Sequence, residues 1–242
     1  MAGYQSGLLP RAASELQSGS AETGMYCPLE PFPVATQPFH GPKRLADIVL
    51  ALAGLILLSP LFAVTALVVT WTSPGSVFFR SRRLGLNGSE FFAWKIRSMY
   101  IDADERLARL LKQDAALRDE YERYHKLKDD PRITSIGRFL RVLSIDELPQ
   151  LLNVLKGEMS IVGPRPKLLF EAKVYGSALA EVLAVRPGLT GLWQTSGRNN
   201  LDMEQRVLLD LEYVRNRTFL GDIVLIVKTT LQLIRPSRHG AC

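Results

Sequence analysis

The stretch LSIDELPQLLNVLKGEMSIVGPRPK, from Leu143 to Lys167, carries the most informative pattern in this sequence. It places two adjacent carboxylates, Asp146 and Glu147, directly before a leucine-rich segment with helical spacing. A turn signature, Gly-Pro-Arg-Pro, closes the stretch and presents Arg165. The pattern predicts a carboxylate pair at the beginning of a helix, followed by a rigid turn that carries a cation.

The acidic pair has a structural and a catalytic interpretation. Ser144 followed three residues later by Glu147 matches a capping box, in which both side chains bind backbone amides. The helix dipole also favours acidic residues in a first turn. Pro149, however, is tolerated only in that first turn, so the pair should lie where free backbone amides can bind phosphate.

Arginines before the pair favour the catalytic interpretation. Arg132, Arg138 and Arg141 lie in the segment DPRITSIGRFLRVL, immediately upstream of the two carboxylates. A guanidinium binds two oxygens of a phosphate at once, which a lysine cannot do. Carboxylates and arginines grouped at the beginning of a helix are typical of a phosphoryl-transfer site.

An uncharged apolar run from Ile48 to Thr70 is the second strong feature. As one helix it would measure about 35 Å, enough to span a bilayer. Ser59-Pro60 interrupts the run at its middle, where proline bends a helix and Ser59 can bond the carbonyl that proline leaves free. Basic residues flank both ends, which favours a re-entrant hairpin over a single span, although composition alone leaves both open.

The rest of the chain divides into recognisable segments. Residues 1–42 are rich in Gly, Ser, Ala and Pro and predict a disordered tail and linker. The segments VFFRSRRLG and SEFFAWKIRSM predict a strand pair that seats aromatic and basic side chains at a membrane interface. We expect helices over residues 102–129, 203–217 and 219–234, the last with an apolar face wide enough to lie on a membrane.

A second turn-rich passage, RPGLTGLWQTSGR, covers residues 186–198. Its three glycines allow a backbone to approach a ligand closely. Arg186, Gln194 and Arg198 are its candidate substrate-binding residues.

Composition narrows the functional classes. The 242 residues carry a net charge of +6, which suits anionic lipid, phosphorylated substrates or nucleic acid. Nucleic acid alone would not require the apolar run. Neither a GxxxxGK[ST] nor a GxGxxG motif is present, which argues against an ordinary nucleotide-binding fold. The two cysteines and three histidines form no zinc-like spacing, so a metal here should be a hard cation held by carboxylates and phosphate.

From Lys43 to the C-terminal helix, the chain resembles the bacterial sugar transferases, which are monotopic polyprenyl-phosphate phosphoglycosyl transferases. The matching segments are KRLADIVLA, the Ser59-Pro60 break, WKIRSM, DDPRITSIGRFLR, SIDELPQLLNVLKGEMSIVGPRP, RPGLTGLWQTSGR and DLEYVRN. One departure is Arg217-Thr218, where relatives commonly have Trp-Ser. Larger relatives carry additional N-terminal membrane helices, so this chain looks like the minimal catalytic form.

The resemblance implies transfer of a sugar 1-phosphate from a UDP-sugar to undecaprenyl phosphate, with release of UMP, in exopolysaccharide, capsule or O-antigen synthesis. It implies Mg²⁺, a covalent phosphosugar on Asp146, and metal binding by Asp146 and Glu147. By motif matching, Lys95, Arg97, Arg141 and Arg165 would hold phosphate oxygens. It also implies a homodimer and a place on the cytoplasmic face of the bacterial inner membrane.

The expected fold is therefore α+β and mostly helical. A membrane-embedded re-entrant helix would cover residues 43–72, and a small cytoplasmic-face catalytic domain with interfacial amphipathic helices would cover residues 73–242. The alternative is a non-catalytic membrane-anchored adaptor that binds anionic lipid or partner proteins. It explains the basic flanks and the apolar run but gives the acidic pair no role. Nucleic-acid binding rests on charge alone, and we expect none.

Overall fold

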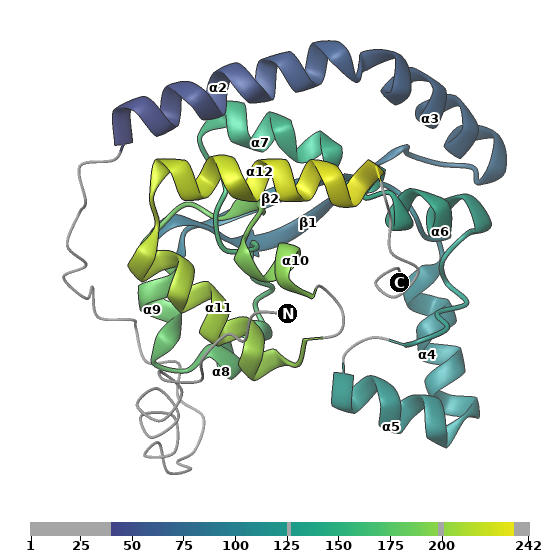
Figure 1. The fold of residues 1–242 in the computed structure, drawn as a ribbon. Coiled ribbons are helices and arrows are strands. Elements are labelled where there is room, and N and C mark those ends of the chain that lie inside the picture. Colours follow the sequence, from purple (N-terminus) through teal and green to yellow (C-terminus); the bar gives the residue numbers. More distant parts are fainter. Residues whose placement is uncertain (1–39, 125–126, 198–200, 235–242) are drawn as a thin grey trace, which may run out of the picture. The chain divides into compact units, whose positions relative to one another are not determined.

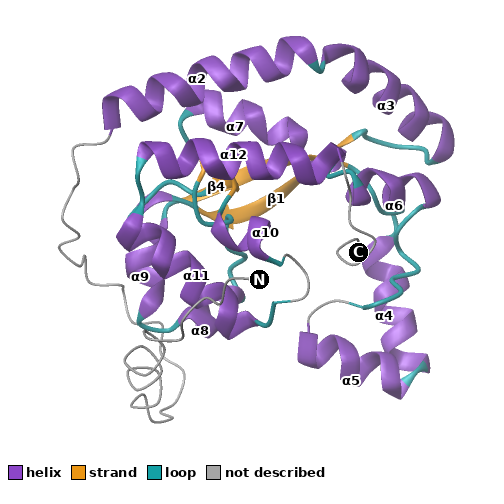
Figure 2. Ribbon diagram, in the orientation of Figure 1, coloured by secondary structure: helices purple, strands orange, loops and turns teal. Residues whose placement is uncertain are grey.

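The computed structural model describes residues 40–124, 127–197 and 201–234 (Figure 1). The chain divides into two compact units, residues 1–32 and 33–242, and every described residue belongs to the second. This unit is mostly helical, with two small two-stranded sheets, which confirms the predicted α+β class (Figure 2). The predicted tail, residues 1–42, lies outside the described residues except for its last three positions.

The bounds of the elements are, in chain order, α2 (His40–Leu57), α3 (Ser59–Thr72), β1 (Phe78–Leu84), η1 (Leu86–Gly88), β2 (Glu90–Ile96), α4 (Ala103–Gln113), α5 (Ala115–Tyr124), α6 (Ser135–Val142), η2 (Ile145–Gln150), α7 (Leu151–Lys156), β3 (Ser160–Val162), α8 (Glu171–Tyr175), α9 (Ala178–Leu183), β4 (Gly188–Thr190), α10 (Leu192–Ser196), α11 (Met203–Asn216) and α12 (Phe219–Ile234). The symbol η marks a 3₁₀-helix.

The apolar run forms two helices, α2 and α3, that meet at a bend of 57°. Proline at position 60 has no N–H to give to the carbonyl of Ile56, and the hydroxyl of Ser59 donates to that carbonyl instead, at 2.8 Å. The predicted break and its hydrogen bond are confirmed. Within the described residues no single helix is long and apolar enough to cross a bilayer, whereas this bent pair meets the length and composition of a broken span or a re-entrant loop.

The basic residues at the start of α2 make bonds inside the protein. The Arg44 guanidinium donates to the carbonyls of Val154 and Leu155, at 2.6 and 2.9 Å. These carbonyls belong to the last turn of α7, where a cation is favoured by the helix dipole. Arg44 therefore fastens α2 along α7, the arrangement visible in Figure 1.

A second polar contact joins α2 to the strand β3 and to α12. Lys43 donates to the carbonyl of Val162, at 3.1 Å, and forms an ion pair with Asp222. Buried Asp47 accepts hydrogen bonds from the hydroxyl of Ser160 and the amide of Ile161, at 3.1 and 3.0 Å. Lys43 and Asp47 therefore bond α2 to β3, and Lys43 also joins α2 to α12.

The two predicted strands near the middle of the chain pair as the antiparallel hairpin β1–β2, with Arg80 opposite Trp94. Phe91 and Ala93 point into the core. On the outward face the guanidinium of Arg80 lies 5.7 Å from the ring centre of Phe92 and 5.5 Å from that of Trp94. The predicted interleaving of aromatic and basic side chains is therefore present on one face of the hairpin.

The second sheet brings two motifs together that are distant in sequence. Strands β3 and β4 are parallel, with Ser160 opposite Gly188. Hydrogen bonds continue past the strands, because the amide of Gly163 donates to Thr190 and that of Gly188 donates to Pro164, at 2.9 and 2.8 Å. The Gly-Pro-Arg-Pro turn and the RPGLTG passage are therefore neighbours.

One predicted helix is wrong in its extent. We expected a continuous helix over residues 102–129, but the chain breaks at Asp114 into α4 and α5. The Asp114 carboxylate accepts hydrogen bonds from the amides of Ala116 and Leu117, at 2.9 and 3.1 Å, and so begins a new helix. The predicted leucine face of this segment is only half-buried.

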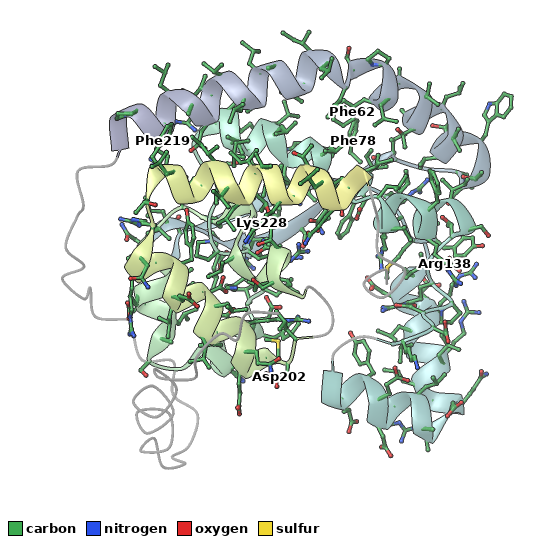
Figure 3. All side chains as sticks on the ribbon, in the orientation of Figure 1. Phe62, Phe78, Arg138, Asp202, Phe219 and Lys228 are labelled. Atoms are coloured by element: carbon green, nitrogen blue, oxygen red, sulfur yellow. The ribbon has the colours of Figure 1, made fainter. Side chains whose placement is uncertain are left out.

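The two C-terminal helices agree with their predictions. An Asp202–Gln205 capping box begins α11, and α12 spans residues 219–234 as expected. The outward face of α12 exposes Leu220, Val227 and Leu231, of which Leu220 is 74% exposed. Figure 3 shows α12 with Phe219 at one end and Lys228 along its length, beneath α2.

Candidate active site

Asp146 and Glu147 lie in the 3₁₀-helix η2, which leads directly into α7. Ser144 before them has a left-handed backbone, φ 55°, and its side chain caps no amide. The structure therefore excludes the capping-box interpretation, because Ser144 turns the chain rather than beginning an α-helix. The Glu147 carboxylate bonds side chains of other elements, Lys95 and Arg165.

Glu147 forms a compact cluster with two cations. Its Oε1 accepts hydrogen bonds from Lys95 Nζ at 2.7 Å and from Arg165 Nη2 at 2.6 Å, and its Oε2 accepts one from Arg165 Nη1 at 3.0 Å. Burial opposes the charge of Glu147, but Arg165 and Lys95 outweigh it and hold the pKa of this carboxyl well below its usual range. Glu147 is therefore charged at neutral pH, and its hydrogen bonds link β2 to the Gly-Pro-Arg-Pro turn.

Asp146, its neighbour, has the opposite character. The residue is 6% exposed, and among the described residues no group donates a hydrogen bond to its carboxylate. Burial, and then the charge of Glu147, raise the pKa of the Asp146 carboxyl to about 6, against the pull of Lys95, Arg141 and Arg165. The site thus contains one carboxylate paired with two cations and one whose pKa is raised and which no described group bonds.

Arg141 reaches the site from α6. Its Nε donates to the hydroxyl of Ser98 at 2.8 Å, just beyond β2. Gly137 allows this approach, because a Cβ at that position would overlap the backbone of Ser98. The hydroxyl of Thr134 caps α6 by accepting from the amide of Gly137, at 2.8 Å.

The other two arginines of the predicted group do not join the pair. Arg132 is buried in a double hydrogen bond with Asp130, with Nε–Oδ1 at 2.8 Å and Nη2–Oδ2 at 2.6 Å. Arg138 is exposed on α6, and Figure 3 shows it at that helix. The predicted cluster of three guanidiniums is therefore wrong, because helical spacing turns Arg138 outward and Arg132 has its own carboxylate.

The remaining predicted binding residues lie on different elements of the structure. The Arg97 guanidinium donates to the carbonyls of Pro74 and Ser73, at 2.8 and 2.5 Å, and so fastens the turn after α3. Arg186 donates from Nε to the carbonyl of Gly157 at 2.9 Å, beyond α7. Gln194 lies in α10, beside the turn of Arg165, and Arg198 lies outside the described residues.

A buried group that the sequence analysis did not single out adjoins the site. Lys167 follows the Gly-Pro-Arg-Pro turn and donates to Oδ2 of Asp210 at 2.5 Å, and Tyr175 donates to the same oxygen at 2.7 Å. The Lys167 ammonium also lies 4.4 Å from the ring centre of Tyr175. This network fixes the chain two residues after Arg165. Lys167 ends the Leu143–Lys167 stretch and Asp210 begins the segment DLEYVRN, but no local pattern in the sequence connects them to each other or to Tyr175.

Comparison with known proteins identifies the family of this chain. The family profile described as "Bacterial sugar transferase" matches residues 39–236. The chain belongs to this family. The matched range contains the bent helix pair, the acidic pair and α12.

Curated relatives support the same assignment of this sugar transferase. An "Exopolysaccharide production protein ExoY" of Sinorhizobium fredii is 46% identical over 211 residues, which cover 87% of this chain and 92% of the relative. An "Undecaprenyl-phosphate galactose phosphotransferase" of Salmonella typhimurium is 45% identical over 82% of this chain, and a "UDP-glucose:undecaprenyl-phosphate glucose-1-phosphate transferase" of Escherichia coli is 39% identical over 78%. This chain covers only 41% and 39% of the latter two.

The donor set of the sugar transferase fits a magnesium ion in part. In the described ranges no three His, Cys, Asp or Glu side chains converge, so the protein offers no complete metal cage. Mg²⁺ commonly takes one or two carboxylates and completes its shell with substrate phosphates and water. The Asp146 carboxylate has free acceptor capacity for such an ion. Oε2 of Glu147, which accepts one bond from Arg165, has a further lone pair.

Proposed function

We propose that this protein transfers a hexose 1-phosphate, glucose or galactose 1-phosphate, from a UDP-sugar to undecaprenyl phosphate and releases UMP. The observation that carries the proposal is the contrast within the acidic pair. The pKa of the Asp146 carboxyl is raised, and no described group donates a hydrogen bond to it. The Glu147 carboxylate accepts hydrogen bonds from Lys95 and Arg165. The names of the relatives from Salmonella typhimurium and Escherichia coli support the donor and acceptor classes.

In the first step, an oxygen of the Asp146 carboxylate attacks the phosphorus that bears the sugar. The bond from this phosphorus to the bridging oxygen breaks, and UMP leaves with the electron pair. The product is a sugar phosphate joined to the Asp146 carboxylate as an acyl phosphate, a mixed anhydride. A pKa of about 6 leaves roughly nine in ten Asp146 side chains ionised at pH 7, and makes them more basic than an ordinary aspartate.

In the second step, a phosphate oxygen of undecaprenyl phosphate attacks the same phosphorus. The bond to Asp146 breaks, the carboxylate is restored, and the sugar is left on a lipid diphosphate. Division into two steps lets the water-soluble UMP leave before the lipid arrives, so one nucleophile can serve both substrates at a membrane surface.

The surrounding cations stabilise charge in both steps. Arg165 and Lys95 are positioned by Glu147, and Arg141 by Ser98, so their donors are fixed before substrate arrives. We propose that Asp146 and Glu147 also hold a Mg²⁺, which would supply Lewis-acid stabilisation of the phosphate oxygens. Lys95 and Arg165 would then donate hydrogen bonds both to Glu147 and to phosphate oxygens of the substrate.

We further propose that α2 and α3 form a re-entrant hairpin in the cytoplasmic leaflet of the bacterial inner membrane, with α12 lying on its surface. The outward residues Leu57 and Trp71 are 79% and 84% exposed, which an aqueous surface would not favour. The bend of 57° and the apolar face of α12 are consistent with this arrangement. The domain boundary at residue 72 and a homodimer remain part of the proposal.

The test is UMP release by the membrane-embedded protein with Mg²⁺, from a panel of UDP-sugars, with and without undecaprenyl phosphate. We expect sustained release only with the lipid, and no release by an Asp146→Asn variant. Arg138→Gln, an exposed change on α6, is the matched control and should keep full activity. Absence of UMP with every donor would favour the non-catalytic adaptor.

A further inference from the structure

Two buried hydrogen-bond donors on α10 and α11 have no acceptor within the part of the chain that the structure describes. The Trp193 side chain is 7% exposed, and its indole Nε1 is buried without a partner. Nε of Arg206 is likewise buried without one. Buried donors are nearly always satisfied in proteins, so two such groups together indicate a missing acceptor.

These two donors form one unit. The guanidinium carbon of Arg206 lies 4.8 Å from the centre of the Trp193 ring, so the cation packs on the indole. Nη1 of Arg206 contacts the sulfur of Met203 at 3.9 Å, which is a weak acceptor. The helices α10 and α11 that carry the two side chains pack on each other. The stack therefore holds Trp193 Nε1 and Arg206 Nε in place without using the N–H group of either.

The stack lies beside the turn that carries Arg165. Helix α10 begins after Gly191, where a Cβ would overlap the carbonyl oxygen of Gly163, so the backbone of the Gly-Pro-Arg-Pro turn touches the beginning of α10. Arg206 is also within electrostatic reach of the site: burial lowers its pKa, Glu171 raises it and Arg165 lowers it again. An anion between Arg165 and Arg206 would relieve the repulsion of these two guanidiniums.

The chemistry of the two groups restricts the ligand. An indole N–H and a guanidinium only donate, so their ligand must present acceptor oxygens. In a UDP-sugar these are phosphate, hydroxyl and uracil oxygens. Arg165 bonds Glu147, the neighbour of Asp146, and the phosphorus that Asp146 would attack bears the sugar. Groups beside Arg165 would thus lie nearest to the hexose 1-phosphate half of the donor.

We infer that Trp193 and Arg206 form the subsite that binds the hexose 1-phosphate half of the UDP-sugar donor. This inference rests on the proposed function and assigns a role to two residues on α10 and α11. Arg206 would contact phosphate or hydroxyl oxygens with charged N–H groups. Trp193 would add one directed hydrogen bond and hold the guanidinium in place.

The experiment measures equilibrium binding of UDP-glucose, UDP-galactose and UMP by calorimetry, with the full chain in detergent micelles. All proteins carry Asp146→Asn, which removes turnover. Trp193→Phe keeps an aromatic ring but removes the N–H, and Arg206→Gln removes the guanidinium. Trp71→Phe, at an 84% exposed tryptophan, and Arg138→Gln, at an exposed arginine, are the matched controls.

For at least one UDP-hexose, we expect a loss of affinity of about five-fold for Trp193→Phe and about ten-fold or more for Arg206→Gln. Affinity for UMP should stay unchanged, which also shows that the variants are folded. An equal loss for UMP and UDP-hexose, or unchanged affinity for all ligands, overturns the inference alone. If the Asp146→Asn parent binds none of the three, the proposed function fails and the inference fails with it.

Discussion

Asp146 and Glu147 are adjacent in the chain, yet their surroundings give the two carboxyls opposite acid strengths. Lys95 and Arg165 both bond Glu147, so its pKa falls, whereas burial raises the pKa of Asp146 to about 6. Separation of the pKa values of two neighbouring acids is a common way to give them different roles. In the proposed mechanism it leaves Asp146 as the nucleophile and Glu147 as the residue that positions cations.

The first residue-scale prediction concerns pH. Asp146 attacks only as the carboxylate, so the rate of UMP release should fall as pH drops through the pKa of this group. That pKa is about 6 without metal, and a bound cation would lower it, so the inflection should lie at pH 6 or below. The measurement is the acid limb of kcat in the pH–rate profile. A rate that rises as pH falls from 7 to 5 would contradict the assignment.

A second residue-scale prediction concerns Lys167 and Asp210, which are 3% and 1% exposed. Asp210→Asn leaves the Lys167 ammonium buried without its counter-charge, and we expect a loss of about 3–5 kcal/mol in the free energy of unfolding. The check is denaturant unfolding in detergent. Glu181→Gln breaks the exposed ion pair with Arg215 and should cost less than about 1 kcal/mol. Equal losses in the two variants would argue against a structural role for the buried pair.

At the scale of elements, the sequence predicted the features that depend on residues close together in the chain. The break at Ser59-Pro60 was predictable down to the hydrogen bond of Ser59, because proline frees a known carbonyl. The strand pair and the helix over residues 219–234 followed from periodicity. The break at Asp114 was missed, because a capping aspartate inside a helical pattern looks like any other surface charge.

What the sequence could not predict at this scale are partners distant in the chain. Arg132 and Arg138 looked equivalent to Arg141 in the sequence, and only the orientation of α6 and the carboxylate of Asp130 separate them. Gly137 likewise carried no visible signal. Its lack of a side chain is required by the backbone of Ser98, which follows a strand in another part of the chain.

The element-scale prediction uses Gly137. Gly137→Ala places a Cβ where the carbonyl of Ser98 lies, and this backbone cannot move without shifting β2 or α6. We expect a loss of about 1–3 kcal/mol in stability, together with a lower kcat, because Arg141 is displaced from the site. Thermal unfolding and UMP release measure the two effects. Gly41→Ala, whose Cβ would meet nothing within 4 Å, is the control and should change neither quantity.

At the scale of the molecule, the helices that we propose to face the membrane are bonded to the elements that carry the site. Lys43 and Arg44 looked in the sequence like flanking charges of a membrane segment, but the structure uses them to fasten α2 to α7, β3 and α12. Strand β3 leads directly to the turn of Arg165, so the helices proposed to enter the membrane are bonded to the segment that completes the site.

The proposed hairpin predicts the same membrane side for both ends of the bent pair. In a protein with Cys27 and Cys242 replaced by Ser, single cysteines at Gly41 and Ser89 should both react with an impermeant thiol reagent from the cytoplasmic side. Both positions are exposed, Gly41 in the first turn of α2 and Ser89 between β1 and β2. Reaction of the two positions from opposite sides would show a spanning helix instead.

The central claim is that Asp146 carries the sugar phosphate between donor and lipid. The most direct measurement incubates the protein with a UDP-hexose and Mg²⁺ without undecaprenyl phosphate, then determines the intact mass and maps any adduct by peptide sequencing. We predict one hexose phosphate per chain, located on Asp146, lost on addition of the lipid and absent from Asp146→Asn. An active enzyme with no adduct, or an adduct that persists in Asp146→Asn, would contradict the account.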